Sequence, residues 1–371
     1  MAVLGHHGHH GHHGHHGHHG HHGHHGHHAP AGAAPTSPLL ATGLALTAEA
    51  LIGYWNGSVA PGPQVTPDAW TALDRLDPEA RSLVLDNEAC SLFRTSPAQN
   101  GSFAVQIGSG PVVTLTPPDA AKIAEQMQEL RSAMDLRADR LPEIIVQQGD
   151  MLSFFGAQQV LNDTRRRRTM MLLNTAYGAV VSQEMRMKHF CSVPRPIDLS
   201  PQIQPIIQTP AHSAYPSGHA TEAFAFATIL SALRLSADRA ASAAGVIDAL
   251  LTKLGPARES APEADPDLLL FRLAARIADN RTVAGVHYPV DSAHGALLGL
   301  AIGLTLVAHC LGGAQAIPSW TAAGNGWSGE FTLGRWVEEL SGWRGPLISV
   351  PAAKDWHLLP HLWQAAAAEW A

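Results

Sequence analysis

The sequence predicts an all-α protein: a helical bundle with one minor β-hairpin and an irregular C-terminal tail. Apolar residues recur at spacings of three and four along most of the chain between residues 39 and 311, as in helices that pack on a core. Hydrophobic residues make up 45 % of the 371 residues, so the chain can bury a sizeable core. Charged residues make up only 15 %, which is consistent with a homo-oligomer.

The N-terminus is a tract of eight Gly-His-His repeats at residues 5–28, which hold 16 of the 24 histidines. The tract has no apolar side chain to bury, so we expect residues 1–38 to be a disordered tail and linker. It is either a purification tag or a native metal-binding tail. Three regions follow: an N-terminal helical region at 39–169, a helical bundle at 170–312 and a C-terminal wrap at 313–371.

Local signals place the elements of the first half of the chain. Apolar spacing predicts helices at residues 39–54, 79–93, 116–140 and 142–163. The third helix is expected to begin where Thr116 caps it and Pro117 opens it, and the fourth is expected to begin at Pro142. Between the second and third helices, extended apolar residues at 102–115 surround a Gly-Ser-Gly turn and predict the hairpin.

The second half of the chain predicts five helices, at residues 165–188, 217–235, 237–254, 265–283 and 290–311. Four consecutive arginines, Arg165 to Arg168, open the first of them, and we interpret this run as a solvated helix face or a subunit contact. The apolar stretch at 293–314 carries His294 and His309, so it predicts a buried core helix rather than a membrane span. We therefore expect a soluble protein with no integral membrane segment.

Composition also limits the kinds of molecule that this protein is expected to bind. The formal net charge is −7, which argues against nucleic acid as a partner. The three cysteines are widely spaced and form neither a disulfide framework nor a CxxC metal pair. We expect Cys90, Cys191 and Cys310 to be inert, small hydrophobic residues.

Three short segments carry groups that suit a tetrahedral oxyanion. The first holds Lys188 and Arg195, the second runs from Tyr215 to Thr221 through Ser217-Gly218-His219, and the third holds Arg281, His287 and Asp291. Taken singly, each of these residues is more often a surface charge, a turn or a core histidine. Their co-occurrence in this order predicts one buried site that holds either vanadate as a cofactor or phosphate as a substrate.

The residue types explain this preference for an oxyanion. Arg195 and Arg281 offer planar, bidentate donors, and Lys188 adds a compact positive charge. Ser217 and Gly218 lie at the predicted start of a helix, where backbone N–H groups and the helix dipole attract an anion. Gly218 also lets the backbone approach the anion without a side chain in the way.

Two histidines complete the pattern. Asp291 lies four residues after His287 and can accept the proton of one ring nitrogen, which leaves the other nitrogen to attack or ligate the central atom. His219 then remains to move protons. Asp150 and Glu184 could support the site from behind, although no spacing requires it.

The three segments resemble the signature motifs shared by vanadium-dependent haloperoxidases and by acid or lipid phosphatases of the type 2 phosphatidic acid phosphatase superfamily. The resemblance covers about residues 170–312 and implies the helical bundle of that superfamily. The wider context, in which His212 precedes His219 by seven residues, is most similar to vanadium bromoperoxidases. Two positions depart from the pattern: Asn280, where many phosphatases have serine, and His189, where haloperoxidases often have an aromatic residue.

The resemblance implies a haloperoxidase: vanadate-dependent oxidation of bromide, chloride or iodide by hydrogen peroxide to hypohalous acid or an equivalent, which halogenates a small organic acceptor. Five residues would hold the vanadate oxygens: Lys188, Arg195, Ser217, Gly218 and Arg281. His287 would bond the vanadium, with Asp291 orienting its ring, and His219 would be the acid–base group. His212 would tune peroxide activation or halide choice.

Two alternatives remain open. The same residues suit a phosphomonoesterase, in which His287 is the nucleophile that forms a phosphohistidine and His219 protonates the leaving alcohol. His212 and the long helical region before Lys188 favour the peroxidase. The second alternative is a nickel or zinc storage protein built on the Gly-His-His tail, but storage does not explain the predicted cage of charged residues.

Four other histidines are weak candidates for a metal site. His357 and His361 are four residues apart, which suits one face of a helix. Pro360 lies between them and disfavours a regular helix, so we expect ordinary residues of the C-terminal wrap. His294 and His309 lie on the last predicted helix and are expected to pack in the core.

Overall fold

The computed structural model describes residues 38–51, 57, 69–237, 242–255 and 265–371. The Gly-His-His repeats lie outside these ranges, so their expected disorder stays a prediction. The chain divides into two units within helix α3 (Pro78–Ser91), with one unit ending at Val84 and the other beginning at Leu85.

The unit that ends at Val84 contains α1 (Pro38–Leu51), α2 (Ala69–Asp74) and the first half of α3. The Arg81 side chain joins the last two, because its guanidinium donates to the carbonyl oxygens of Leu73, Asp74 and Leu76. Both helices predicted in this part of the sequence are present among the described residues.

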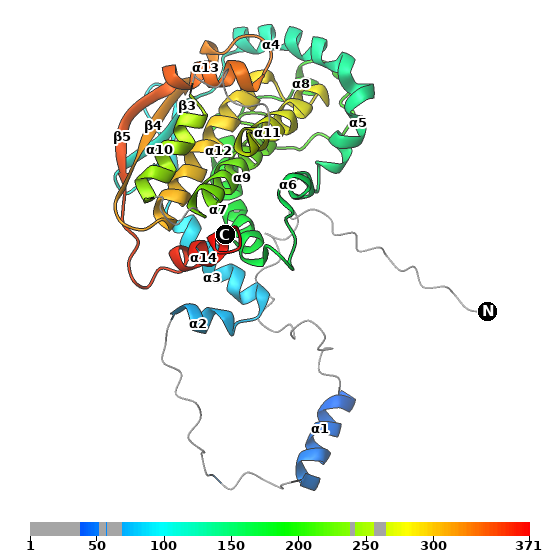
Figure 1. The fold of residues 1–371 in the computed structure, drawn as a ribbon. Coiled ribbons are helices and arrows are strands. Elements are labelled where there is room, and N and C mark those ends of the chain that lie inside the picture. The colour runs from blue at the N-terminus through cyan, green and yellow to red at the C-terminus, as the bar shows by residue number, and fades with distance from the viewer. Residues whose placement is uncertain (1–37, 52–56, 58–68, 238–241, 256–264) are drawn as a thin grey trace, which may run out of the picture. The chain divides into compact units, whose positions relative to one another are not determined.

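The unit from Leu85 to Ala371 holds a helical bundle (Figure 1). Its α-helices are α4 (Ala120–Ala133), α5 (Arg137–Val146), α6 (Leu152–Gln159), α7 (Arg167–Cys191), α8 (Pro196–Leu199), α9 (Gly218–Ser236), α10 (Ala243–Lys253), α11 (Pro266–Val283), α12 (Pro289–Cys310), α13 (Leu333–Trp343) and α14 (Leu359–Ala367). Every residue of α12 is buried, and it packs along α9, which in turn packs on α7 and α11. The bundle is therefore built around α12.

Helix α12 is apolar because it is surrounded by protein. Among the described helices it alone is long and apolar enough to cross a bilayer, and that stretch is entirely buried inside the molecule. The prediction of a buried core helix is thus confirmed for this segment.

Three glycines allow α12 to approach α9 very closely: Gly295, Gly299 and Gly303. A Cβ atom at Gly299 would overlap the carbonyl oxygen of Thr221 on α9. The contact also aligns the starts of the two helices, where the backbone N–H of Ser217 donates to the carbonyl oxygen of Asp291 at 2.9 Å. Residues of the second and third sequence segments are therefore brought side by side by helix packing.

Two of the predicted helix starts are wrong. Thr116 is the last residue of a strand, and α4 begins only at Ala120, with Asp119 as the N-cap that accepts from the Lys122 N–H. Pro142 does not start a helix but lies inside α5, which ends at Val146. A proline in a helix interior removes one backbone hydrogen bond, and α5 continues past it with Ile144 buried against residues at the end of α11. The helices predicted after residue 165 are confirmed to within a few residues, except that α10 begins at Ala243 rather than at residue 237.

A five-stranded sheet replaces the expected minor hairpin. Its strands are β1 (Arg94–Pro97), β2 (Phe103–Ile107), β3 (Gly110–Thr116), β4 (Gln315–Ala323) and β5 (Arg344–Val350), in that spatial order. The predicted hairpin is β2 and β3, and β3 pairs in parallel with β4 while the other neighbours are antiparallel. The expectation of an irregular C-terminal tail is therefore wrong, because this segment supplies two strands, α13 and α14.

The arginine run before α7 binds the C-terminus of the same chain. The backbone N–H groups of Arg168 and Thr169 donate to the Glu369 carboxylate at 2.7 and 2.9 Å, which caps the start of α7. The Arg166 guanidinium lies 4.0 Å from the ring centroid of Trp370. These contacts tie the last helix of the chain to the bundle.

Candidate active site

The three sequence segments meet at one cavity of about 460 Å³. Six of the predicted site residues line its wall: Arg195, His212, Gly218, His219, Arg281 and His287. The other three, Lys188, Ser217 and Asp291, are buried and contact residues of these same segments. The geometry thus joins His212 and eight residues of the three segments, while the roles assigned to them stay predictions.

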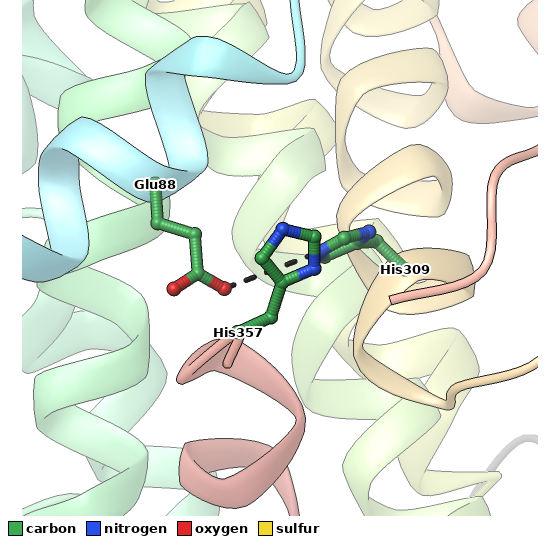
Figure 2. A group of neighbouring side chains, drawn as sticks. All are labelled: Glu88, His309 and His357. Carbon is green, nitrogen blue, oxygen red and sulfur yellow. Dashed lines mark ion pairs between the residues drawn. The ribbon is translucent and has the colours of Figure 1, made fainter. Parts of the chain in front are cut away.

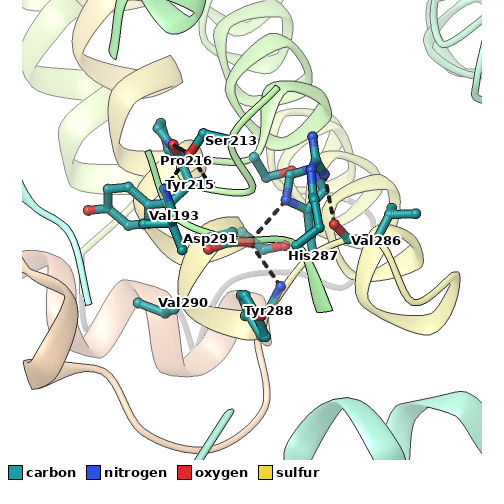
Figure 3. Close-up of polar contacts among 12 residues, drawn as sticks. Val193, Ser213, Tyr215, Pro216, Val286, His287, Tyr288, Val290 and Asp291 are labelled. Atoms are coloured by element: carbon teal, nitrogen blue, oxygen red, sulfur yellow. Dashed lines mark hydrogen bonds and ion pairs between the residues drawn. The ribbon is translucent and has the colours of Figure 1, made fainter. Parts of the chain in front are cut away.

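His287 is held by Asp291 (Figure 3). The Nδ1 atom of His287 lies 3.0 Å from Oδ2 of Asp291, which also accepts the backbone N–H of Tyr288 at 3.0 Å. Asp291 occupies the first turn of α12, so the helix start fixes its carboxyl group. Burial raises the pKa of Asp291 to about 7, although the Tyr288 hydrogen bond and the charge of Lys188 favour its ionised form.

The other nitrogen of His287 faces a cation. Its Nε2 lies 3.1 Å from Nη1 of Arg195. Burial, followed by the positive charges of Arg195 and Lys188, holds the pKa of His287 well below its usual range. With Nδ1–H donated to Asp291, the neutral ring carries its lone pair on Nε2, as a nucleophile or ligand requires.

Arg195 is fixed along both edges of its guanidinium. Nη1 donates to the carbonyl oxygen of Val286 at 2.7 Å, and Nε donates to that of His212 at 2.9 Å. Nη2 lies 3.1 Å from Nδ1 of His212. The backbone is fixed as well, because the Arg195 N–H donates to the Asp198 carboxylate in the first turn of α8, which Pro196 opens. This arginine is held before any ligand binds.

Arg281 has donors to spare. Its Nη2 donates to Oε1 of Gln147 at 3.1 Å and to the Ile144 carbonyl oxygen at 3.3 Å. Its Nε and Nη1 are buried without a hydrogen-bond partner among the described residues. Unsatisfied buried guanidinium N–H groups are costly, and a tetrahedral oxyanion would satisfy both. Asn280, which departs from the phosphatase pattern, donates to the same Gln147 oxygen at 2.9 Å and so holds it in place.

The start of α9 forms another part of the wall. Ser217 is the N-cap, and its hydroxyl accepts from the Ala220 N–H. Gly218 follows on the cavity wall, where a Cβ atom would come within 2.7 Å of Oε1 of Glu184. A larger residue at this position would displace the Glu184 carboxyl group, so glycine lets the start of α9 lie close to it.

Lys188 acts on the cavity from behind the wall. Its ammonium group donates to the carbonyl oxygens of Ser213 and Pro216 in the loop before α9. Burial lowers its pKa to about 8, against the opposing effect of Glu184. Lys188 is not among the residues that line the cavity, so its predicted contact with oxyanion oxygens has no counterpart in this arrangement.

The remaining two histidines, His219 and His212, both line the cavity wall, but they contact different residues. Nε2 of His219 lies 3.0 Å from the carbonyl oxygen of Gln147. His212 is bound to Arg195, and burial together with the nearby Lys188 and Arg195 lowers its pKa to about 4. His189, the departure from the haloperoxidase pattern, is exposed and does not line the cavity.

The cavity wall also carries two carboxyl groups, those of Glu184 and Glu222, that were not expected there. Glu184 was expected only as a support from behind, and Glu222 was not predicted at all. Burial raises the pKa of Glu184 to about 7 and that of Glu222 well above its usual range. Within the described part of the chain, Oε2 of each has no hydrogen-bond partner. Glu222 lies three residues after His219 on α9, so helical spacing could have revealed it. Asp150 instead lies before α6 and accepts the Ser153 N–H of its first turn.

Apolar side chains complete the cavity. Tyr177, Val181 and Met185 share one face of α7, and Ile207 and Pro210 come from the loop before α9. The cavity therefore has a polar end made by the arginines and histidines and room beside it for an uncharged group.

One comparison with known proteins finds a family match over part of the chain. A family model described as the PAP2 superfamily matches residues 169–312, which contain all three segments. No curated protein matches this chain. Among solved structures, the chain is similar to a transmembrane PAP2-type phosphatidylglycerolphosphate phosphatase from Bacillus subtilis, with 17 % identity, a TM-score of 0.34, and coverage of 51 % of this chain and 85 % of that one. The relation to vanadium haloperoxidases finds no support in these comparisons.

Proposed function

We propose that this cavity hydrolyses phosphate monoesters. One observation carries the proposal: Nε2 of a neutral His287, oriented by Asp291, lies 3.1 Å from the guanidinium of Arg195 at a cavity where Arg281 has two unpaired donors. The match of residues 169–312 to the PAP2 superfamily supports it independently. The function that the sequence favoured, halide oxidation, thereby becomes the second candidate.

The reaction has two steps. Arg195 and Arg281 bind the phosphoryl oxygens, and Nε2 of His287 attacks phosphorus, forming a P–N bond as the P–O bond to the alcohol breaks. His219 gives its proton to the leaving oxygen. Water then attacks phosphorus, His219 takes a proton from it, and the P–N bond breaks to release phosphate and neutral His287.

His219 must change partners to perform this role. Its Nε2 lies 3.0 Å from the carbonyl oxygen of Gln147, so the ring exchanges this hydrogen bond for one to the leaving oxygen when substrate binds. Bonds of catalytic groups are often made only in the complex, so the present contact is compatible with an acid–base role. The apolar side chains of α7 would face the alcohol part of the ester.

Release of p-nitrophenol from p-nitrophenyl phosphate tests the proposal on the full chain. Protein quenched in an alkaline denaturant should also carry a phosphate on His287 that is stable to base and labile to acid. Loss of both signals in His287→Ala is expected. Hydrolysis without any phosphorylated protein would contradict the nucleophilic role of His287, and no hydrolysis of any phosphate monoester would contradict the function itself.

Vanadate-dependent halide oxidation remains the second candidate function because of His212. The phosphatase steps have no use for this third imidazole, which lies on the cavity wall and binds Arg195. The unpaired donors of Arg281 and Nε2 of His287 suit vanadate as well as phosphate, since both are tetrahedral oxyanions. When bound, vanadate would supply an electrophilic centre that activates hydrogen peroxide toward halide.

The two candidates separate in paired assays on one sample. Vanadate, hydrogen peroxide and bromide are added with a dye whose bromination is followed, and phosphate release is measured in parallel. Bromination that falls in His212→Ala, with phosphate release reduced by no more than a few fold, would favour the peroxidase. Absence of bromination at saturating vanadate, while vanadate inhibits phosphate release, would exclude it.

A further inference from the structure

Figure 2 shows a second cluster of two histidines and a carboxylate, and none of its three residues lines the cavity. Glu88 comes from α3, His309 from the last turn of α12 and His357 from the loop before α14. One nitrogen or oxygen atom from each residue lies within 4.8 Å of the other two. We propose that these three side chains bind a divalent transition-metal ion, with Zn²⁺ as the ion that fits them best.

The strongest indication of a bound metal ion comes from His309. Its side chain is 1 % exposed, and neither ring nitrogen has a hydrogen-bond partner among the described residues. The nearest polar atom recorded, Oε1 of Glu88, lies 3.9 Å from Nε2, which is too long for a hydrogen bond. A buried, unsatisfied imidazole costs free energy, and a metal ion between these two atoms would remove that cost.

The spacing suits one ion. Zinc binds nitrogen and oxygen ligands at about 2.0–2.2 Å, so two ligands in tetrahedral geometry lie roughly 3.3–3.6 Å apart. The gap between Glu88 and His309 exceeds this by only a few tenths of an ångström. His357 must approach by a somewhat larger amount, and it lies in a loop rather than in a helix. Small side-chain movements therefore close the site.

The carboxylate is already oriented for this role. Backbone N–H groups of Leu358 and Leu359 donate to Oε2 and Oε1 of Glu88 at 2.8 and 3.0 Å. Each oxygen keeps a lone pair beyond these bonds. Burial raises the pKa of Glu88, but the His309 contact and the two backbone donors outweigh it, so the pKa falls below its usual range and the group is ionised. Such supporting bonds are typical around metal ligands.

His357 is neutral and holds its place less firmly. Burial lowers its pKa, so the ring can offer a lone pair at neutral pH. Its Nδ1 accepts the backbone N–H of Lys354 at 3.0 Å, and ligation through that nitrogen replaces this bond. Two imidazoles and one carboxylate suit zinc and leave a fourth position for water, whereas calcium and magnesium prefer oxygen ligands throughout.

The ion would join three segments that are distant in sequence. It would tie α3 and the loop before α14 to the end of the central helix. Along α12, His309 lies about 27 Å from Asp291, so the ion takes no part in chemistry at the cavity. Its expected role is to stabilise the C-terminal part of the fold.

Thermal unfolding of the full, chelator-stripped chain with and without Zn²⁺ tests the site. The Gly-His-His tail also binds zinc, but it is identical in every variant, so differences between variants report on the cluster. The wild type and the control His361→Gln should gain on the order of 5 °C in Tm at zinc concentrations about 100-fold above Kd. Glu88→Gln and His357→Gln should gain little, and gel-filtered samples should hold one zinc fewer per chain.

The His357→Gln variant is expected to fold, because His357 is only half-buried and its replacement removes a ligand without opening the core. An equal Tm gain and equal zinc content in the wild type and His357→Gln would overturn the site. The measurement does not use enzyme activity, so its outcome tests the metal site independently of the proposed phosphatase function.

Discussion

Both ends of helix α12 pair a histidine with a carboxylate, yet the two pairs differ. At the N-terminal end, His287 and Asp291 are hydrogen-bonded at 3.0 Å, and Arg195 faces the second nitrogen. At the C-terminal end, His309 and Glu88 are 3.9 Å apart, and the third neighbour is another imidazole. The charges around a histidine–carboxylate pair, rather than the pair itself, therefore decide which ion the site can bind.

The helix itself contributes to this polarity. A hydrogen bond from Ser217 to Asp291 joins the N-terminal ends of α9 and α12, and Gly218 and His219 of α9 line the cavity, so the partial positive charge of these helix ends lies near it. The C-terminal end of α12 carries partial negative charge, and there the protein places His309. One end is therefore suited to an oxyanion and the other to a cation.

The largest expected effect comes from removing the proposed nucleophile. His287→Ala should lower kcat for p-nitrophenyl phosphate by at least about 10³-fold, because no other group can form the phosphorylated intermediate. His357→Gln, at the other end of α12, should retain full activity. Initial rates of both purified variants check this, and a His287→Ala enzyme within about tenfold of the wild type would break the proposed asymmetry.

Isosteric changes of the two carboxylates sharpen the comparison. Asp291→Asn should lower kcat by roughly 10²–10⁴-fold, since a neutral amide no longer stabilises the positive charge that the His287 ring gains when its Nε2 bonds phosphorus. Its Tm should change little, because an amide oxygen can still accept the Tyr288 N–H. Glu88→Gln should show the converse, with normal kcat and no zinc-dependent gain in Tm. Equal behaviour of the two variants in either assay would contradict this division.

The middle of α12 holds the two ends in place, so a change there should affect both. Gly299→Ala places a Cβ atom against the carbonyl oxygen of Thr221 and should destabilise the fold by about 1–3 kcal/mol. Gly342→Ala in α13 is the matched control, since a Cβ atom there meets nothing within 4 Å, and it should be neutral or slightly stabilising. Denaturant unfolding compares them, and equal stability would show that α9 can move away.

The sequence predicted the parts of this molecule that depend on local pattern. Helix α12 was predicted because its apolar residues are continuous, and the oxyanion residues were predicted because each segment is short and specific. The pairing of β3 with β4 was missed, since it joins strands about two hundred residues apart that no local signal connects. For this reason the sequence predicts irregular structure where the two C-terminal strands, β4 and β5, form.

The site shows the same limit. Gln147, which positions Arg281, belongs to none of the three segments and is brought in by the packing of α5 against α11. The sequence pairs His357 with His361 and places His309 in the core with His294, because the residue that relates His309 to His357, Glu88, lies on a helix far upstream. Clusters of this kind exist only in the folded chain.

The smallest expected effect concerns the carboxyl groups that oppose the positive charge of the cavity. Because burial raises the pKa of Glu184 to about 7, the group is protonated and uncharged below that pH and ionised above it. Ionised Glu184 lies beside Gly218 and would repel the phosphoryl oxygens, so kcat/KM should fall as pH rises through 7. Between about pH 6 and pH 7.5 the ionisation of one such group predicts a decrease of about fourfold.

Glu184→Gln cannot ionise and should flatten this decrease, whereas exposed Glu125→Gln should leave it unchanged. The substrate's own ionisation is common to all three proteins and cancels in the comparison of pH profiles. At the other end of α12 the carboxylate of Glu88 has the opposite shift and stays ionised over this range, as a cation site requires. A profile in Glu184→Gln identical to the wild type would show that the cavity binds its anion without regard to this carboxyl group, and the electrostatic contrast between the two ends would then rest on the arginines alone.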